Sequence, residues 1–248
     1  MLNEIVTAGD MTGKQRNTLL AEMTEDVGNL VLGNNYKQTQ ALSLAERRAR
    51  ERQGEYKRLM AALEAAGKLD RALEFLPSEE ELNERATKGQ GLTRPELSVL
   101  ISYSKIELQE ALIKSDITDD EYLSREMETA FPPRLAQEYG EAMRRHRLKR
   151  EIVSTQIAND LVNHMGITFV QRLKESTGVG SAQVAAAYVV VRDVFHLPFW
   201  WRQIEALDNQ VPADLQLTMM DELMRLGRRA TRWYCLLYTS PSPRDQRG

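Results

Sequence analysis

The chain has 248 residues, of which 42% are hydrophobic and 28% charged, and its formal net charge is -3 at pH 7. This length allows one large domain or two small ones, and the balanced charge argues against a nucleic-acid-binding protein, whose domains are usually strongly basic. No stretch approaches the ~20 apolar residues of a membrane span, and the single cysteine, Cys235, excludes an intrachain disulfide framework, so we expect a soluble cytoplasmic protein.

The first 50 residues carry helix signals. Thr12 and Gln15 form a possible capping box, and apolar residues recur at helical spacing over 19–31. The Gly-Asn-Asn sequence at 33–35 is predicted to interrupt this helix. A second helix is predicted over 36–52.

The next segment contains shorter helices. Residues 61–66 are rich in Ala, Leu and Glu, and Gly67 is predicted to end their helix. A short helix is predicted over 69–75, stopped by Pro77. Another capping box starts at Ser78.

Residues 91–105 give the clearest helix signal, and the apolar spacing continues to residue 112. Thr93 can cap the helix, Pro95 fits its first turn, and Glu96 completes a capping box with Thr93. The apolar residues that follow fall on one helical stripe and are predicted to be buried. They are Leu97, Leu100, Ile101, Leu108 and Leu112.

The second half of the chain also carries helix signals. Thr118 and Glu121 form a fourth possible capping box. Further helices are predicted after the prolines at 132–133, over 148–165, and from an N-cap at Ser181 through residue 195. Pro198 and Pro212 are predicted to lie in the first turns of the last two helices. No pair of alternating strands is convincing, so we predict an all-α fold, a multi-helix bundle with an N-terminal helical extension.

Residues 236–248 differ from the rest. Apolar residues no longer recur at helical spacing in this segment, and the two prolines of its Ser-Pro-Ser-Pro sequence are incompatible with a helix there. We interpret this segment as a non-native disordered tail, and the alternative is a genuine disordered terminus.

Two glycine motifs resemble nucleotide-binding loops but are incomplete. Around Gly13-Lys14 a phosphate-binding loop would need a glycine at position 8 and a hydroxyl at position 15, where the chain has Ala and Gln. Gly178 and Gly180 lack the third glycine of the dinucleotide fingerprint. We interpret the first as a capped helix start and the second as a turn, so no cofactor-binding residue is predicted.

No residue set predicts a metal site or a nucleophile. The histidines His146, His164 and His196 are not at ligand spacing from one another or from a carboxylate cluster. His146 is expected to be solvated and the other two partly buried and hydrogen-bonded. Cys235 has no visible partner base. We therefore predict no catalytic and no metal-binding residue in this chain.

Two further clusters leave alternatives open. Arg144–Arg150 could contact an anion or a nucleic acid, or could be a solvated helix face that pairs with Glu138, Glu141 and Glu151. The three aromatic residues at 199–201 cannot all be buried on one helical face. One of them is therefore expected to contact a neighbouring helix, domain or subunit.

Four ordered blocks of sequence resemble one family. They lie at 15–43, at 91–105, at 131–152 and at 163–173, and the last reads Asn-His-Met-Gly-Ile-Thr-Phe-Val-Gln-Arg-Leu. Together they resemble the C-terminal part of the large bacterial NAD-specific glutamate dehydrogenases, enzymes that convert glutamate to 2-oxoglutarate and ammonia.

The resemblance implies a division of the chain. Residues 1–50 would be the closing helices of the catalytic region, 51–90 a helical connector, 91–235 the C-terminal helical domain, and 236–248 the tail. The family's substrate lysine, catalytic aspartate and nucleotide glycines would lie upstream, so this piece is expected to be inactive and to hold no cofactor, although the parent would use NAD. The chain would then be truncated at both ends.

The resemblance also implies partners. The helical piece would pack on the upstream catalytic region of the same protein, and the parent would be a homo-oligomer. The alternatives are a free-standing helical protein-interaction module, and an anion or nucleic-acid binder through Arg144–Arg150.

Overall fold

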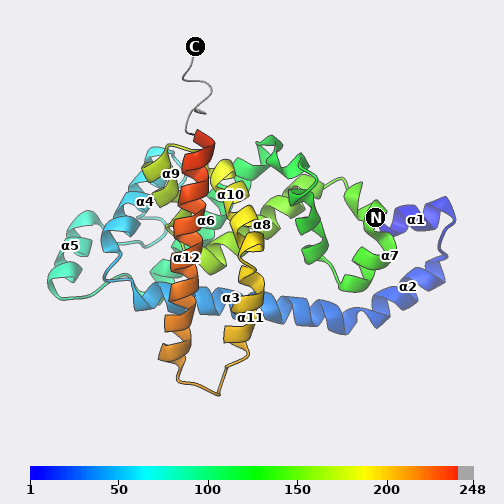
Figure 1. Ribbon diagram of the computed structural model, residues 1–248, viewed down its shortest axis with the longest axis horizontal. Coiled ribbons are helices and arrows are strands. Elements are labelled where there is room, and N and C mark those ends of the chain that lie inside the picture. The colour runs from blue at the N-terminus through cyan, green and yellow to red at the C-terminus, as the bar shows by residue number, and fades with distance from the viewer. Residues whose placement is uncertain (240–248) are drawn as a thin grey trace, which may run out of the picture.

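A computed structural model describes the backbone of residues 1–239 and the side chains of residues 1–237. Every regular element in that range is helical, which confirms the predicted all-α fold (Figure 1). The elements are α1 (Leu2–Ala8), α2 (Gly13–Glu22), α3 (Thr24–Arg47), α4 (Gln53–Ala65), α5 (Glu79–Thr87), α6 (Arg94–Ile113), the 3-10 helices η1 (Asp116–Asp119) and η2 (Leu123–Ala130), α7 (Pro133–Arg144), α8 (Lys149–Met165), α9 (Phe169–Thr177), α10 (Ser181–Val194), α11 (Leu197–Glu205) and α12 (Ala213–Thr239).

The long helix α3 connects the N-terminal helices to the rest of the molecule. Its 24 residues span roughly 36 Å at 1.5 Å per residue, and in Figure 1 it runs along the lower side from α2 to the region of α4. The predicted interruption at 33–35 is wrong, because the helix passes through Gly33 without a break. One glycine costs a helix only about 1 kcal/mol, and the second half of α3 packs against α6 and α8.

Two other helix boundaries differ from the prediction. The helix expected over 36–52 ends at Arg47, and a turn over 48–52 leads directly into α4. The short helix expected over 69–75 is a series of turns, in which Phe75 has a positive φ of 53°. The seven residues of 69–75 are too few to offset the cost of helix nucleation without strong packing.

Helix α6 lies at the centre of the core. Its capping box is present as predicted, and the backbone N–H of Thr93 donates to Oε2 of Glu96 at 2.7 Å. The predicted stripe is confirmed, since all five of its apolar residues are at most 6% exposed. The face they form packs against α8, which in turn packs on η2, and α10 packs against α12.

The prolines and glycines of the second half mark helix ends, as predicted. Helix α7 begins at Pro133, α8 ends before Gly166, and Pro198 lies in the first turn of α11. Two predicted caps are wrong. Thr118 lies inside η1 with its side chain buried, and Gly180 takes the N-cap position expected for Ser181.

Helix α12 continues four residues into the segment predicted to be non-helical. It ends at Thr239, two residues before Pro241, which is the first residue in that segment that cannot extend a helix. Residues 240–248 lie outside the described residues, so the nature of the tail stays a prediction. No helix within the described residues is long and apolar enough to cross a membrane.

Because α6 lies at the centre of the core, substitutions at its buried and exposed positions should lower the free energy of unfolding by different amounts. Leu100→Ala and Leu108→Ala are each expected to lower the free energy of unfolding by roughly 2–5 kcal/mol, since both side chains are 0% exposed. Lys114→Ala, at an exposed position just after the helix, should change it by about 0.5 kcal/mol or less. Chemical denaturation of the three variants measures the difference, and equal midpoints would contradict the central position of α6.

Candidate functional site

A buried cluster of charged residues joins three helices of the core. The guanidinium of Arg192, on α10, contacts Oε1 of Glu126 on η2 at 2.5 Å and Oδ2 of Asp160 on α8 at 3.1 Å. The side chains of Arg192 and Glu126 are only 10% and 11% exposed. Because these ions lie in a region of low effective dielectric constant, each needs its partners to remain charged.

Asp160 extends this cluster to two further side chains. Its Oδ1 lies 2.8 Å from Nδ1 of His164, and its Oδ2 accepts a hydrogen bond from the hydroxyl of Tyr188 at 3.0 Å. Burial raises the pKa of Asp160, but the charges of His164 and Arg192 and their hydrogen bonds outweigh it and hold the pKa well below its ordinary value. The ring of His164 also stacks on Trp201 at 5.0 Å between centroids.

The buried cluster is suited to holding helices together. Burial and the nearby charge of Asp160 raise the pKa of Tyr188 well above its ordinary value, so this hydroxyl remains a hydrogen-bond donor. Glu126 is 8% exposed and Tyr188 0%, so these two side chains have little access to a substrate. We therefore regard the cluster as a structural element and not as a catalytic centre.

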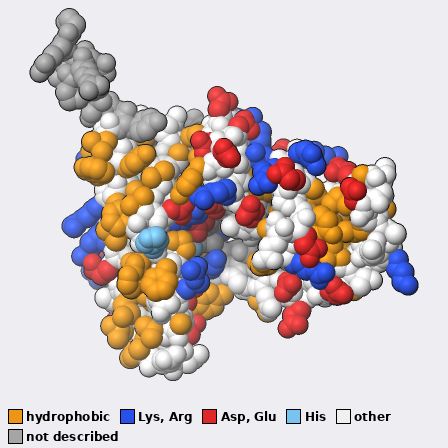
Figure 2. All heavy atoms as spheres, turned by 45° about the vertical axis from the view of Figure 1, so that its right-hand side comes forward, with side chains coloured by type: hydrophobic (Ala, Val, Ile, Leu, Met, Phe, Trp, Pro, Cys, Tyr) orange, Lys and Arg blue, Asp and Glu red, His pale blue; other side chains and the backbone are white. Residues whose placement is uncertain are grey.

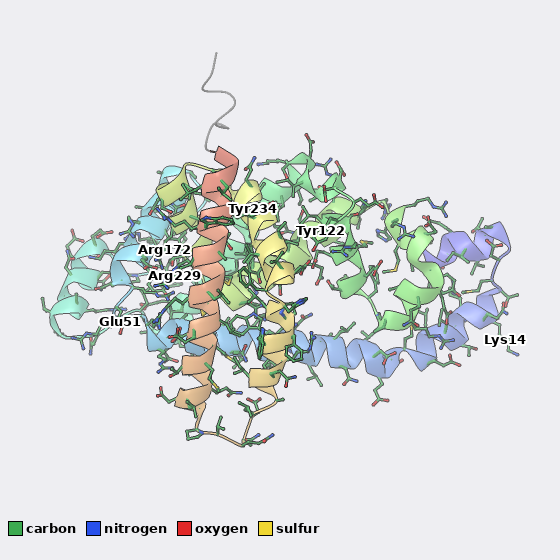
Figure 3. The ribbon with its side chains drawn as sticks, viewed as in Figure 1. Lys14, Glu51, Tyr122, Arg172, Arg229 and Tyr234 are labelled. Atoms are coloured by element: carbon green, nitrogen blue, oxygen red, sulfur yellow. The ribbon has the colours of Figure 1, made fainter. Side chains whose placement is uncertain are left out.

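A second cluster of charge lies at the surface, where three elements meet. Five arginines line a pocket with about 320 Å³ of empty space, counting its open mouth. The turn between α3 and α4 provides two of them, α9 one and α12 two, and Figure 3 labels the arginine of α9, Arg172. We call this the arginine pocket. Its arginines are Arg48, Arg52, Arg172, Arg225 and Arg228.

A third site is an apolar groove between the N-terminal helices and the start of α7. Its empty space is about 1340 Å³, counting its open mouth. Figure 2 shows hydrophobic side chains gathered on the side of the molecule that carries these helices. We call this the N-terminal groove. The apolar residues that line it are Met1, Leu2, Leu20, Met23, Val27, Leu30, Val31, Ala130, Phe131, Pro132 and Leu135.

The aromatic residues at 199–201 divide as predicted. Trp201 is 2% exposed in the core, whereas Phe199 and Trp200 are 47% and 50% exposed. Exposed apolar side chains also occur at the end of α10 and on α12, and we call this set together with Phe199 and Trp200 the aromatic patch. They are Val194, Phe195, Leu215 and Met219.

The basic run Arg144–Arg150 does not form a continuous helical face, because α7 ends at Arg144 and α8 begins at Lys149. The expected pairing of Glu141 is confirmed, since it contacts Arg144. The expected pairing of Glu138 with the run is wrong, because Glu138 contacts Arg134 at 2.9 Å.

Arg150 leaves the run and points into the structure. It pairs with Asp119 at 3.0 Å and donates to the carbonyl oxygen of Ile113, the last residue of α6, at 3.1 Å. This arginine therefore satisfies a helix end. The run offers no continuous basic face for a nucleic acid.

The three histidines have different surroundings. His146 is partly buried, and its Nδ1 accepts a hydrogen bond from the backbone N–H of Leu148. His164 is buried and hydrogen-bonded, as expected. His196 is exposed, contrary to expectation, because it occupies a left-handed position (φ 51°) in the sharp turn between α10 and α11. No group of three or more His, Cys, Asp or Glu side chains within the described residues is arranged to hold a metal ion.

The interpretation of both glycine motifs as helix ends is confirmed. The N–H of Gln15 donates to Oγ1 of Thr12 at 3.2 Å, and the N–H of Thr12 donates to Oε1 of Gln15 at 2.8 Å. Gly178 has a φ of 76° and ends α9, and Gly180 caps α10. The sequence analysis missed the buried cluster and the arginine pocket. Only the four-residue spacing of Asp160 and His164 could have indicated the former, since the other members lie far apart in the sequence.

Comparison with known proteins gives consistent matches along the chain. Residues 89–245 match the family model "Glutamate dehydrogenase, C-terminal", and residues 1–45 match "Bacterial NAD-glutamate dehydrogenase, catalytic domain". The NAD-specific glutamate dehydrogenase of Pseudomonas aeruginosa is 78% identical over 234 residues, which are 94% of this chain and 14% of that protein. Proteins of the same name from Halomonas elongata and Mycobacterium tuberculosis are 56% and 32% identical over 99% and 98% of the chain. The chain thus spans 14–15% of the length of these relatives.

The buried cluster predicts a large effect of removing its cation. Arg192→Met is expected to lower the free energy of unfolding by roughly 3–5 kcal/mol at neutral pH, because the buried Glu126 and the partly buried Asp160 would lose their cation. The control Arg202→Met changes an exposed arginine of α11 and should cost about 0.5 kcal/mol or less. Denaturant unfolding compares the two. A similar small loss in both would contradict the proposed role of the cluster.

The same variant should also change the response to acid. The lowered pKa of Asp160 means that its interactions stabilise the fold above the pKa of an unfolded aspartate, about 3.9, and that this stabilisation is lost as the pH falls. The difference in stability between wild type and Arg192→Met should therefore shrink as the pH falls below about 4. Unfolding curves over a pH series measure this difference.

Proposed function

Because the chain belongs to the NAD-specific glutamate dehydrogenase family, we propose that it is the helical C-terminal scaffold of such an enzyme. The parent protein converts glutamate to 2-oxoglutarate and ammonia with NAD. The nucleotide and substrate sites lie in the part of the parent that this chain does not contain. The scaffold packs against the catalytic region and fixes its orientation.

The observation that carries this proposal is the continuity of α3. The match to the catalytic-domain model covers residues 1–45, and α3 runs without a break from Thr24 to Arg47, through the end of that match. Its second half buries Ala41 and Leu44, and it packs against α6 and α8 of the C-terminal domain. One rigid helix therefore belongs to both regions, and movement of one region is transmitted to the other.

The first half of α3 supports a contact with the missing catalytic region. Val27, Val31 and Leu32 are 48%, 54% and 67% exposed, although a helix this exposed is normally polar on its solvent side. Val27 and Val31 line the N-terminal groove. Exposed apolar surface of this extent typically marks an interface. We propose that the preceding catalytic region of the same polypeptide fills the groove.

The aromatic patch is the surface we propose for contact between copies of the parent. Phe199 and Trp200 are about half exposed, and large aromatic residues are enriched in protein interfaces. That the parent is a homo-oligomer stays a prediction. The alternative of a nucleic-acid binder has little support, because Arg144–Arg150 is divided between two helices and Arg150 points inward.

The isolated chain is expected to oxidise no glutamate. Its two glycine motifs act as a helix cap and a turn, so neither can receive the pyrophosphate of NAD. Purified chain mixed with glutamate and NAD should produce no NADH, while the full-length parent under the same conditions serves as the positive control. NADH production by the chain alone would overturn the expected inactivity.

A substitution in the groove should affect the parent more than the isolated chain. Val31→Asp is expected to leave the stability of the chain within about 0.5 kcal/mol, because Val31 is exposed there. In the full-length parent it should lower the melting temperature and the activity, because a charge would be buried against the catalytic region.

Asn29→Asp is the matched control for this experiment. Asn29 is exposed on the same helix, about 160° around the axis from Val31 at 3.6 residues per turn, and does not line the groove. Asn29→Asp should change neither the stability of the isolated chain nor the melting temperature and activity of the full-length parent. Equal behaviour of the two variants in the full-length parent would refute occupation of the groove by the catalytic region.

A further inference from the structure

The arginine pocket contains more positive charge than its carboxylates can neutralise. Arg48 pairs with Asp221 at 3.0 Å, and Arg172 pairs with Glu55 at 2.9 Å. Within the side chains that the structure describes, neither Arg52 nor Arg228 forms an ion pair or a side-chain hydrogen bond. Two guanidinium groups in the pocket thus lack a partner.

The neighbouring carboxylates cannot supply the missing charge. Oε2 of Glu55 accepts a hydrogen bond from the hydroxyl of Thr168 at 2.7 Å in addition to its pair with Arg172. Asp221 is 5% exposed, and its Oδ2 is shared between Arg48 at 3.0 Å and Arg47 at 4.0 Å. Both carboxylates are therefore already committed to other cations.

The remaining arginine, Arg225, pairs at 3.1 Å with Glu222, its neighbour on the same turn of α12. This pair lies at the exposed rim, since the two side chains are 45% and 59% exposed, so it adds little net charge to the pocket. The excess therefore lies with the two partly buried arginines of the pocket. It amounts to about two positive charges, those of Arg52 and Arg228.

The excess charge opposes folding as long as it has no counterion. Burial lowers the pKa of Arg228 below its ordinary value, and the nearby charges of Arg172 and Arg52 lower it further. A guanidinium nevertheless stays protonated at neutral pH, so the repulsion is not relieved by loss of a proton. A bound anion would relieve it.

The walls of the pocket favour a small ligand. Met165, Phe169 and Met224 line it beside the arginines, and its empty space of about 320 Å³ includes the mouth. Little of that space lies within the walls, so a whole nucleotide would not fit between the side chains. A single tetrahedral oxyanion would bind at the mouth of the pocket, where arginine side chains can contact its oxygens in a bidentate manner.

We propose that the arginine pocket binds one phosphate group, either as free phosphate or as the end of a phosphomonoester. A phosphate group, with between one and two negative charges near neutral pH, offsets most of the charge of the two unpaired arginines, Arg52 from the turn between α3 and α4 and Arg228 from α12. The bound group connects these elements with α9, which contributes Arg172. Since α3 also belongs to the region that matches the catalytic domain, phosphate stiffens the joint between that region and the C-terminal helices. This inference does not depend on the proposed scaffold role.

Calorimetric titration of the 248-residue chain with inorganic phosphate tests the proposal. Sodium chloride keeps the ionic strength constant, which separates specific binding from screening. Wild-type protein should bind one phosphate, and Arg52→Gln and Arg228→Gln should each weaken binding roughly tenfold or more. Arg229→Gln is the matched control, because Arg229 is the next residue of α12, is exposed and does not line the pocket. It should leave the affinity nearly unchanged.

Two further measurements keep the test decisive. If either glutamine variant fails to fold, Arg52→Lys and Arg228→Lys retain the charge but lose the bidentate geometry, and they should also bind phosphate more weakly. Glycerol 3-phosphate, used in a parallel titration, identifies the source: tighter binding than inorganic phosphate indicates a phosphomonoester, and weaker binding indicates the free ion. The proposal is overturned if neither compound binds wild-type protein, or if the pocket variants bind as the Arg229→Gln control does.

Discussion

The permanent charge of a buried arginine constrains the core of this protein. Arg192 cannot lose its proton at neutral pH, so the chain must bring carboxylates to it wherever it is buried. Glu126 comes from η2 and Asp160 from α8, two segments that also pack against each other. The 3-10 helix η2 packs against α8, and the contact of Glu126 with Arg192 links it to α10 as well. The orientation of η2 then determines where α7 begins, and α7 forms one wall of the N-terminal groove.

Local signals made part of this fold predictable. The capping box of Thr93 and Glu96 and the apolar stripe that follows involve residues only three or four apart, so helical periodicity alone places them. The continuity of α3 was not predictable in the same way, because packing of its second half on α6 and α8 overrides the weak local preference of Gly33. The end of α3 at Arg47 and the extent of α12 to Thr239 show the same limit, since the length of a helix also depends on the elements that pack against it.

The candidate sites were less predictable than the helices. The arginine pocket combines the turn after α3, the start of α9 and the middle of α12, and the buried cluster combines η2, α8 and α10. The arginines of the pocket are scattered through the sequence among many others that lie on the surface, and no spacing distinguishes them. Arg144–Arg150 stood out in the sequence because its charged residues are adjacent. In a helical chain rich in charge, however, a run of adjacent charged residues is usually a solvent-exposed segment. Charges that matter for binding are those whose partners are missing, and only the three-dimensional contacts identify them.

The uninterrupted course of α3 also restricts how the length of this protein can change. Each residue of a helix adds rotation as well as length. One residue inserted in the exposed half of α3 would therefore turn everything before it by about 100° and displace it by about 1.5 Å. The apolar side of the helix would then face away from the groove. Insertion of seven residues would nearly restore the angle but move the two regions apart by about 10 Å. The number of residues in this part of α3 therefore sets the relative rotation of the two regions that the helix joins. This number matters even at positions where the side chain can be exchanged freely.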